Sequence, residues 1–395
     1  MKQTSAMIPI LALAAFCSLT AMRIADPLLP VIASEFLISP GTASRIVSAF
    51  AISYGICQFG FGPLADKFGK LHVITCALCL SILTNLGVAL SESLESITVW
   101  RALSGGAAAG IVPLAMAWVG ETVEYEKRQP VLAKLLFGTL GGTIGGQILG
   151  GICADSSQWR YGFYFLASLY AICAATLWKT SKQLNKTHTP HKSANVKAHH
   201  HMANVLKKTW PRVILLTVGI EGIAVYGSLS FIPLYLHTQL DISLTMAGLI
   251  MASFGLGGIL YAVCVKRLIA RLGESGLALG GGTLLGLAFL ILILSTHWLS
   301  SVFAVFLIGL GLYMLHNTLQ THATQMAPES RGTAVSLFAC FLFMGQFIGV
   351  TAAGSVVDTL GISTIFSVSC VTLPLIGFLF SRALKKNRVH LKSGG

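Results

Sequence analysis

Twelve long apolar segments dominate this chain, and each is long enough to cross a membrane. A spanning α-helix needs roughly 20 mostly apolar residues. The segments cover about residues 7–33, 43–64, 71–90, 96–119, 131–153, 161–178, 213–236, 245–265, 276–295, 299–322, 333–357 and 362–381. In lipid every backbone polar group must be satisfied internally, which leaves helices or a closed barrel. Because the runs are too continuous for the alternating strands of a barrel, we expect twelve membrane-spanning helices.

The scarcity of charge points to the same solvent. Only 10% of the 395 residues are charged and 54% are hydrophobic, whereas soluble proteins carry about 25% charged residues. The first segment lies where a signal peptide would, but its apolar stretch continues into Arg23, Asp26 and Pro27. Signal peptides have a shorter apolar core and a small-residue exit, so we interpret this segment as a retained span.

The 27 Lys and Arg residues are distributed very unevenly between the two sides. With both termini inside, 23 of them fall in inner loops and tails, Arg45 and Arg160 fall outside, and Arg23 and Arg101 lie within spans. This is the pattern of the positive-inside rule, and it predicts cytoplasmic termini. The net charge of +13 therefore needs no nucleic-acid partner, and we expect contact with anionic membrane lipid instead.

The sequence gives no sign of an enzyme, a cofactor or a metal. The nine cysteines all lie in apolar segments. Cys76 and Cys79 have redox or metal spacing, but they fall inside a span, so we interpret them as buried thiols. The glycine run of the fifth span lacks the preceding strand and the following Lys-Ser/Thr of a phosphate-binding loop. Neither a Ser-His-Asp set nor paired catalytic carboxylates are evident.

A polar stretch divides the spans six and six. Residues 179–212 are rich in Lys, His, Thr and Asn, and we interpret them as a flexible cytoplasmic linker. The linker separates a six-helix bundle at 1–178 from a second bundle at 213–395, which ends in a basic cytoplasmic tail. The His199–His201 triplet belongs to this linker, and we interpret it as solvated rather than as a metal site.

The two halves repeat at an offset of 203 positions. This offset places Pro30 on Pro233, Thr42 on Thr245, Glu126 on Glu329, Arg128 on Arg331 and Asp155 on Asp358. Glycine matches are common in spans, but matches of Pro, Glu, Arg and Asp at one offset are harder to obtain by chance. The repeat predicts two parallel, pseudo-symmetric bundles.

Ionisable side chains well inside spans occur on the first, fourth, seventh and tenth spans. They are Arg23, Asp26, Arg101, Glu221 and His316. A charge at mid-bilayer costs about 2.5–3.5 kcal/mol on insertion scales, so such residues are functional candidates. Each of these spans is the first helix of a three-helix unit.

Asp26, Arg101 and Glu221 are our candidates for proton coupling. Arg23 and Asp26 are three residues apart and share a helix face, so they can neutralise each other. Arg101 cannot lose its proton, but it can hold a carboxylate ionised. Glu221 lies near mid-depth of the seventh span. The alternatives are a structural ion pair for Arg23–Asp26, hydrogen bonds from Arg101 to backbone carbonyls, and a packing role for Glu221.

A second group of polar residues is expected to line a substrate cavity. His316 and Gln320 are four apart in the tenth span, and Tyr54 and Gln58 are four apart in the second. Residues at this spacing share a helix face. The alternative is that these side chains only form hydrogen bonds between helices. The full set of cavity candidates is Arg23, Tyr54, Gln58, Tyr313, His316, Asn317 and Gln320.

The loop after the second span carries the most specific motif. Residues 62–70 read GPLADKFGK, and this resembles the G-x-L-a-D-r-x-G-r loop of the major facilitator superfamily. Asp26–Pro30 is similar to the D-x-x-x-P of its twelve-span drug:proton antiporters. Arg101–Gly105 resembles their R-x-x-q-G, with Ser104 in place of Gln. The resemblance covers nearly the whole chain.

The fifth span resembles an antiporter signature with one departure. The signature is g-x-x-x-G-P-x-x-G-G, and Gln147 stands where Pro is usual. Small residues at this spacing let helices approach closely, so we expect the fifth and eleventh spans to form sliding surfaces between the halves. The matching positions are Gly142, Gly146, Gln147, Gly150 and Gly151.

The family resemblance implies an all-α integral membrane protein with twelve transmembrane helices in two pseudo-symmetric six-helix bundles. It also implies a conformational latch at the cytoplasmic side. Asp66 would face the inner end of the eleventh span near Gly332, where a helix N-terminus offers partial positive charge. The latch candidates are Gly62, Asp66, Lys67, Gly69, Lys70, Glu121 and Glu124.

We expect a secondary active transporter in a bacterial inner membrane, working as a monomer. It would export a small organic solute or drug in exchange for protons by alternating access. Because no ATPase motif is present, any uphill transport must draw on an ion gradient. One alternative is a proton-coupled importer of a sugar, nucleoside or amino acid, which the departure at Gln147 leaves open. A non-transporting receptor is the other, and the ionisable groups on four spans argue against it.

Overall fold

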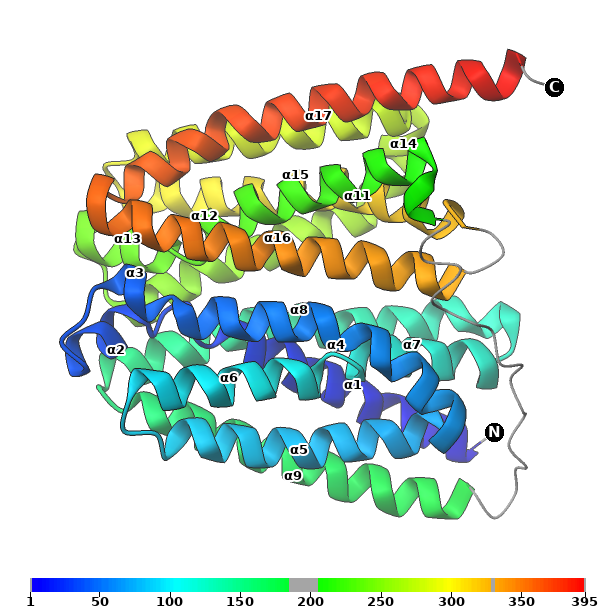
Figure 1. The fold of residues 1–395 in the computed structure, drawn as a ribbon, viewed down its shortest axis with the longest axis horizontal. Helices are drawn as coiled ribbons and strands as arrows, with labels where there is room; N and C mark the ends of the chain where they lie inside the picture. Colours follow the sequence, from blue (N-terminus) through cyan, green and yellow to red (C-terminus); the bar gives the residue numbers. More distant parts are fainter. Residues whose placement is uncertain (1, 185–204, 328–330, 394–395) are drawn as a thin grey trace.

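The computed structural model describes residues 2–184, 205–327 and 331–393. Within these residues the chain folds into helices, most of them long and lying side by side (Figure 1). Both termini lie at one end of the bundle, which we call the terminal end; α3 lies at the other, the distal end. Residues 185–204, which include the His199–His201 triplet, are outside the described part of the chain.

The N-terminal half, residues 2–184, provides six spans. Three of these spans consist of two helices each, because the backbone breaks inside them. The helices are α1 (Lys2–Arg23), α2 (Leu29–Glu35), α3 (Pro40–Ala43), α4 (Arg45–Phe68), α5 (Lys70–Ala89), α6 (Leu94–Ala108), α7 (Ile111–Thr122), α8 (Tyr125–Asp155) and α9 (Trp159–Leu184).

The C-terminal half, residues 205–393, begins its first span with α11 and a π-helical turn, η1. The α14 helix is interrupted at Gly273, whose φ of 63° and ψ of 175° are not helical. The elements are α11 (Thr209–Glu221), η1 (Gly222–Tyr226), α12 (Gly227–Leu229), α13 (Ile232–Leu240), α14 (Leu244–Leu294), α15 (Trp298–Gln325), α16 (Arg331–Leu360) and α17 (Ile362–Ser393).

The number of spans agrees with the sequence prediction. Eleven helical stretches of the described residues are long and apolar enough to cross a membrane. One of them is α14, whose 51 residues are divided at Gly273, so it holds two spans and the total is twelve. The expected twelve-helix fold is confirmed.

The first spans of both halves are interrupted. The α1 helix ends at Arg23, and a turn at residues 24–28 precedes α2. Pro27 and Pro30 cannot donate backbone hydrogen bonds, which accounts for this break. In the seventh span the π turn η1 follows Glu221 directly, and π turns occur frequently at functional sites. Irregular backbone inside a membrane is tolerated where protein encloses it.

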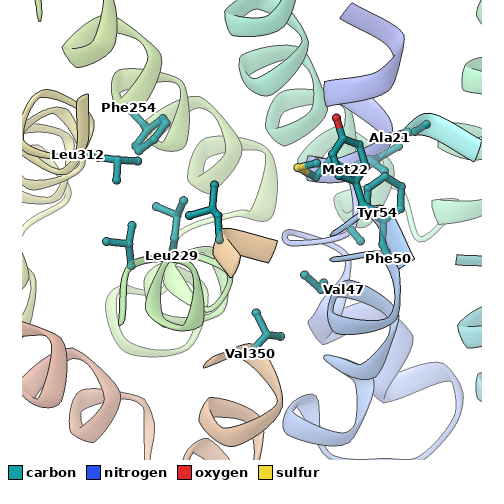
Figure 2. Packing of buried hydrophobic residues seen from close by; sticks show 14 of the residues in the cluster. Ala21, Met22, Val47, Phe50, Tyr54, Leu229, Phe254, Leu312 and Val350 are labelled. Carbon is teal, nitrogen blue, oxygen red and sulfur yellow. The ribbon is translucent and has the colours of Figure 1, made fainter. Parts of the chain in front are cut away.

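The two halves pack mainly through two pairs of helices, α4 with α16 and α8 with α14, and α3 also contacts α16. Glycines permit the closest approaches, although three of the glycines in the fifth-span motif, Gly142, Gly146 and Gly150, pack against the first span within the N-terminal half and not between the halves. A side chain at Gly248 of α14 would collide with the backbone of Gln147, and one at Gly151 would collide with Leu244. Figure 2 shows buried apolar side chains on both sides of this boundary, including Met22 and Phe50 from the N-terminal half.

Candidate functional site

Asp26 lies in the break between α1 and α2 and is completely buried. Its Oδ2 atom has two partners. Arg23 Nη1 lies 3.5 Å away, and Gln147 of α8 donates a hydrogen bond from Nε2 at 2.9 Å. Asp26 Oδ1 and Gln147 Oε1 are both buried and have no hydrogen-bond partner among the described residues. The guanidinium of Arg23 and the amide of Gln147 therefore both contact one oxygen of the carboxyl group, and the other oxygen has no hydrogen-bond partner among the described residues.

Arg23 connects this carboxyl group to the other half of the protein. Its guanidinium lies 4.8 Å from the centre of the Tyr226 ring, and Tyr226 is the last residue of η1. A guanidinium over an aromatic face is attracted by the ring, more strongly when water is excluded. Because Arg23 is only 4% exposed, this contact joins the first span to the seventh at the boundary between the halves.

Arg101 is fully buried and binds backbone carbonyls. It donates from Nη1 to Ala21 O at 2.7 Å and from Nε to Ile46 O at 3.1 Å. Its guanidinium also packs 4.4 Å from the centre of the Phe50 ring. These contacts match the alternative interpretation of Arg101, in which it forms hydrogen bonds with backbone carbonyls of neighbouring spans. Its charge nevertheless lies near enough to act on Asp26, so a coupling role stays a prediction.

Glu221 and His316 form a second buried pair, in the C-terminal half. Glu221 is the last residue of α11 and is completely buried. Its Oε2 atom lies 2.8 Å from His316 Nδ1 of α15, while its Oε1 atom has no partner in the described part of the chain. The His316 ring also packs against Phe338, with ring centres 5.3 Å apart. Each half thus contains one buried carboxyl group on its first span.

The other predicted cavity residues lie on α4 and α15. Tyr54 is buried and packs against Phe343 of α16, with ring centres 4.5 Å apart. Tyr313 packs between Phe254 and Tyr261. Gln58 and Asn317 are half-buried, and Gln320 is exposed. That these residues line a substrate cavity stays a prediction.

A cavity of about 830 Å³ lies elsewhere, where α4, α5 and α6 meet. Its lining is mainly apolar and includes Phe61 and Leu103, together with the thiols of Cys57 and Cys76. None of the predicted cavity residues belongs to it. The buried charges, rather than this groove, therefore mark the candidate site.

The predicted latch residues lie at the terminal end. Lys70 Nζ is 2.7 Å from Glu121 Oε1, which ties the start of α5 to α7. Lys127 forms an exposed ion pair with Glu124, 2.6 Å long, and its hydrogen bond lowers the pKa of the Glu124 carboxyl below the ordinary value. Gly69 has a φ of 87° at the junction of α4 and α5, a conformation that favours glycine.

Asp66 itself is exposed, and Lys67 lies over the Phe68 ring at 5.1 Å. No hydrogen bond or ion pair joins Asp66 to another described residue. Side chains added at Gly62 or Gly332 would meet open space. The Lys70–Glu121 contact lies within the N-terminal half, so in this conformation the described latch residues do not bridge the halves.

Two carboxylates join the halves at the distal end instead. Asp155, the last residue of α8, accepts hydrogen bonds from the backbone N–H groups of Leu244 and Thr245, both at 2.8 Å. Asp358 of α16 accepts from Gly41 N at 3.0 Å and from Ser39 Oγ at 2.6 Å. The offset of 203 positions relates these two contacts. The sequence marked both aspartates as repeat matches but did not predict that they join the halves.

The sequence also missed which side chains pair. Gln147 was singled out only as a departure from a proline motif, and Glu221 and His316 were assigned to separate roles. These pairs join residues 121 and 95 positions apart. The two residues of each pair meet only because of how the packed helices are rotated relative to one another. A local sequence pattern does not indicate that rotation.

Comparison with known proteins decides the family. The sequence model of the Major Facilitator Superfamily matches residues 11–350, and a second match covers residues 214–394. The chain belongs to the major facilitator superfamily. It is a membrane-spanning transporter of this superfamily, and the fold and family expected from its motifs are confirmed.

Two bacterial relatives match most of this superfamily transporter. It is 23% identical over 375 residues to the quinolone resistance protein NorA of Staphylococcus aureus, covering 93% of each chain. It is 22% identical over 339 residues to the MFS-type transporter YceJ of Bacillus subtilis, covering 83% of each.

Solved structures of the same fold include transporters of other substrates. The nucleoside transporter NupG has a TM-score of 0.77 at 13% identity, covering 98% of this chain and 100% of its own. A D-xylose-proton symporter has a TM-score of 0.74 at 12% identity, covering 96% of each chain. At these identities the likeness shows the shared fold alone.

Proposed function

We propose that this transporter exports a small organic solute or drug across a bacterial inner membrane in exchange for protons. The observation that carries the proposal is the pair of buried carboxyl groups, Asp26 and Glu221, one in each half. Each has one oxygen in a polar contact and one oxygen without a hydrogen-bond partner among the described residues. A buried carboxyl group with a free oxygen can bind a proton inside the membrane, where a proton-coupled transporter needs such a group.

Export is supported by the similarity to NorA, whose name describes quinolone resistance. The similarity extends over nearly the whole of both chains. The motifs in the first, fourth and fifth spans, which resemble those of drug:proton antiporters, point to the same direction of transport. Asp26, Arg101 and Glu221 are the proposed coupling residues, and the polar faces of α4 and α15 are the proposed substrate contacts.

The charge distribution supports a cytoplasmic position for the terminal end. The hydrogen bonds made by Asp155 and Asp358 then close the periplasmic side. At the terminal end, by contrast, the Lys70–Glu121 contact stays within the N-terminal half and the described latch residues do not bridge the halves. The conformation is accordingly inward-facing, ready to take substrate from the cytoplasm. In this scheme the two bundles, residues 1–178 and 213–395, rock about the site as one monomer.

The cycle follows from the two buried carboxyl groups. Protons bind at the side of higher proton concentration while substrate leaves, and the reverse exchange takes place at the cytoplasmic side. Moving one charge across the membrane is worth about 2.3 kcal/mol per 100 mV. Neutralising a buried carboxylate also lowers the cost of moving it past apolar surfaces, which links protonation to the change of conformation.

Proton-coupled import is the second candidate. The fold shared with a nucleoside transporter and a D-xylose-proton symporter and the glutamine at position 147 keep it open. Cells that express the wild-type chain or an Asp26→Asn, Glu221→Gln variant test the direction. Wild-type cells should accumulate less of a labelled fluoroquinolone than variant cells. Greater accumulation of uridine or xylose in wild-type cells, with no effect on the quinolone, would favour import.

A further inference from the structure

Two unpartnered oxygens lie on side chains that are already in contact. Gln147 Nε2 donates to Asp26 Oδ2 at 2.9 Å. The second oxygens of the same two groups, Asp26 Oδ1 and Gln147 Oε1, are buried and have no partner in the described part of the chain. The two residues are 0% and 2% exposed, so water does not reach them readily.

A carboxylate oxygen and an amide oxygen are both acceptors, so neither can satisfy the other. One added proton changes this. A protonated carboxyl group has an O–H donor and keeps an acceptor oxygen. It can donate to the amide oxygen while the amide N–H continues to donate back. A single proton therefore satisfies both unpartnered oxygens, and only one O–H bond forms or breaks as the proton arrives from water or returns to it.

We propose that Asp26 and Gln147 together form a proton-binding site as a carboxylic acid–amide pair, with Gln147 as the positioning residue. This inference rests on the proposed proton coupling and specifies its site. A proline, which the related motif carries at position 147, has no side-chain donor or acceptor and cannot form such a pair. The glutamine is therefore a distinguishing feature of this chain.

The groups around Asp26 define the competing ionised state. Arg23 lies 3.5 Å from Oδ2, Arg101 is the second cation whose charge acts on the group, and the Ser230 hydroxyl faces it from the seventh span. The ionised carboxylate is thus held by Arg23 and by the Gln147 N–H, whereas the protonated acid would form two hydrogen bonds with Gln147. Glu221 differs, because its partner is a histidine that can itself bind the proton.

Gln147 also lies at the contact between the halves. Its backbone carbonyl packs against Gly248 of α14, where no side chain would fit. The residue that holds the proton on Asp26 is thus part of the α8–α14 crossing. A change in its side-chain hydrogen bonds acts on a surface that has to rearrange when the distal end opens.

The test is infrared difference spectroscopy of the full-length protein in membranes, titrated with acid and base. The band of a protonated carboxyl group assigned to Asp26 is the one that Asp26→Asn removes. Gln147→Leu and Gln147→Met remove both the donor and the acceptor of the amide, and Met keeps an unbranched shape. The matched control is Gln346→Leu in α16, since Gln346 is also buried with an unpartnered Oε1.

We expect the Asp26 band to move to higher wavenumber in both Gln147 variants, because the acid carbonyl loses its N–H donor. We also expect the band to disappear at lower pH, because the acid loses two hydrogen bonds to Gln147, whereas the carboxylate loses only the N–H donor and keeps Arg23. Gln346→Leu should change neither quantity.

An unchanged band overturns the proposal, and so does a shift to higher pH, which would mean that Gln147 stabilises the carboxylate instead. If Asp26→Asn removes no carboxyl band, the proposal is also overturned, because Asp26 would then hold no proton. Failure of the proposed function gives a different result, namely an intact acid–amide signature in a protein whose transport ignores the pH gradient.

Discussion

The carboxylate of Asp155 accepts a hydrogen bond from the backbone N–H of Thr245, 2.8 Å away, across the boundary between the two halves. The second oxygen of this carboxylate accepts from Leu244, so it lies at the N-terminus of α14, where the helix dipole favours negative charge. Asp358 makes the equivalent contact with Gly41. The internal repeat therefore provides two related contacts between the halves, both at the distal end of the molecule.

Removing one of these charges should loosen the distal end. A hydrogen bond to a charged group contributes about 1.5–3 kcal/mol, so Asp155→Asn should speed amide exchange at Leu244 and Thr245 by at least about tenfold. Asp358→Asn should do the same at Gly41. Hydrogen–deuterium exchange with mass spectrometry measures both. Asp241→Asn is the matched control, since Asp241 lies at the same end, is exposed and has an αL backbone that Asn also tolerates. Equal exchange in Asp155→Asn and the control would contradict the assignment.

Arg101 should contribute to stability in addition to its proposed role in coupling. Arg101→Lys keeps the charge but cannot reproduce the two directed bonds to Ala21 and Ile46, because lysine is a point charge without the guanidinium fork. Each carbonyl left without its donor costs about 1–3 kcal/mol. We expect the thermal midpoint of the detergent-solubilised protein to fall by several degrees. An unchanged midpoint would contradict the structural contribution of the two carbonyl bonds, whatever the effect on transport.

Glu221 and His316 should be energetically coupled. Residues in direct contact show interaction energies of about 0.5–3 kcal/mol in double-mutant cycles. The cycle of Glu221→Gln and His316→Gln, measured by chemical denaturation, should therefore give at least about 1 kcal/mol. The Glu274–His322 pair is the internal comparison, because its 3.4 Å contact is longer and its carboxylate is partly exposed. Additive effects for Glu221 and His316 would show that their contact is not significant for stability.

Much of the fold could be predicted from the sequence, because a span needs only enough apolar residues in a row. Burial of Asp26, Arg101 and Glu221 was predictable for the same reason, since they interrupt such runs. Partners were not predictable. Gln147 reaches Asp26, and His316 reaches Glu221, only through the rotation and depth of separate helices. The π turn after Glu221 had no signal either, since no proline marks it.

The latch motif predicts a kinetic effect. Asp66 is exposed at the terminal end and makes no bond with a described residue in this conformation, so its contacts should form only when that end closes. Asp66→Asn should lower turnover several-fold while leaving the thermal midpoint and substrate binding unchanged. Glu121→Gln, which removes the Lys70 contact, is the comparison within one half. Loss of stability in Asp66→Asn would contradict a role confined to the cycle.

Proton-coupled export is tested most directly with purified protein in liposomes that contain a pH-sensitive dye. With an imposed pH gradient, wild-type protein should drive a fluoroquinolone toward the side of higher proton concentration, and protons should move the opposite way. The Asp26→Asn, Glu221→Gln variant should show neither flux while retaining its fold. Quinolone movement that is equally fast without the gradient, or unchanged in the double variant, would contradict the account.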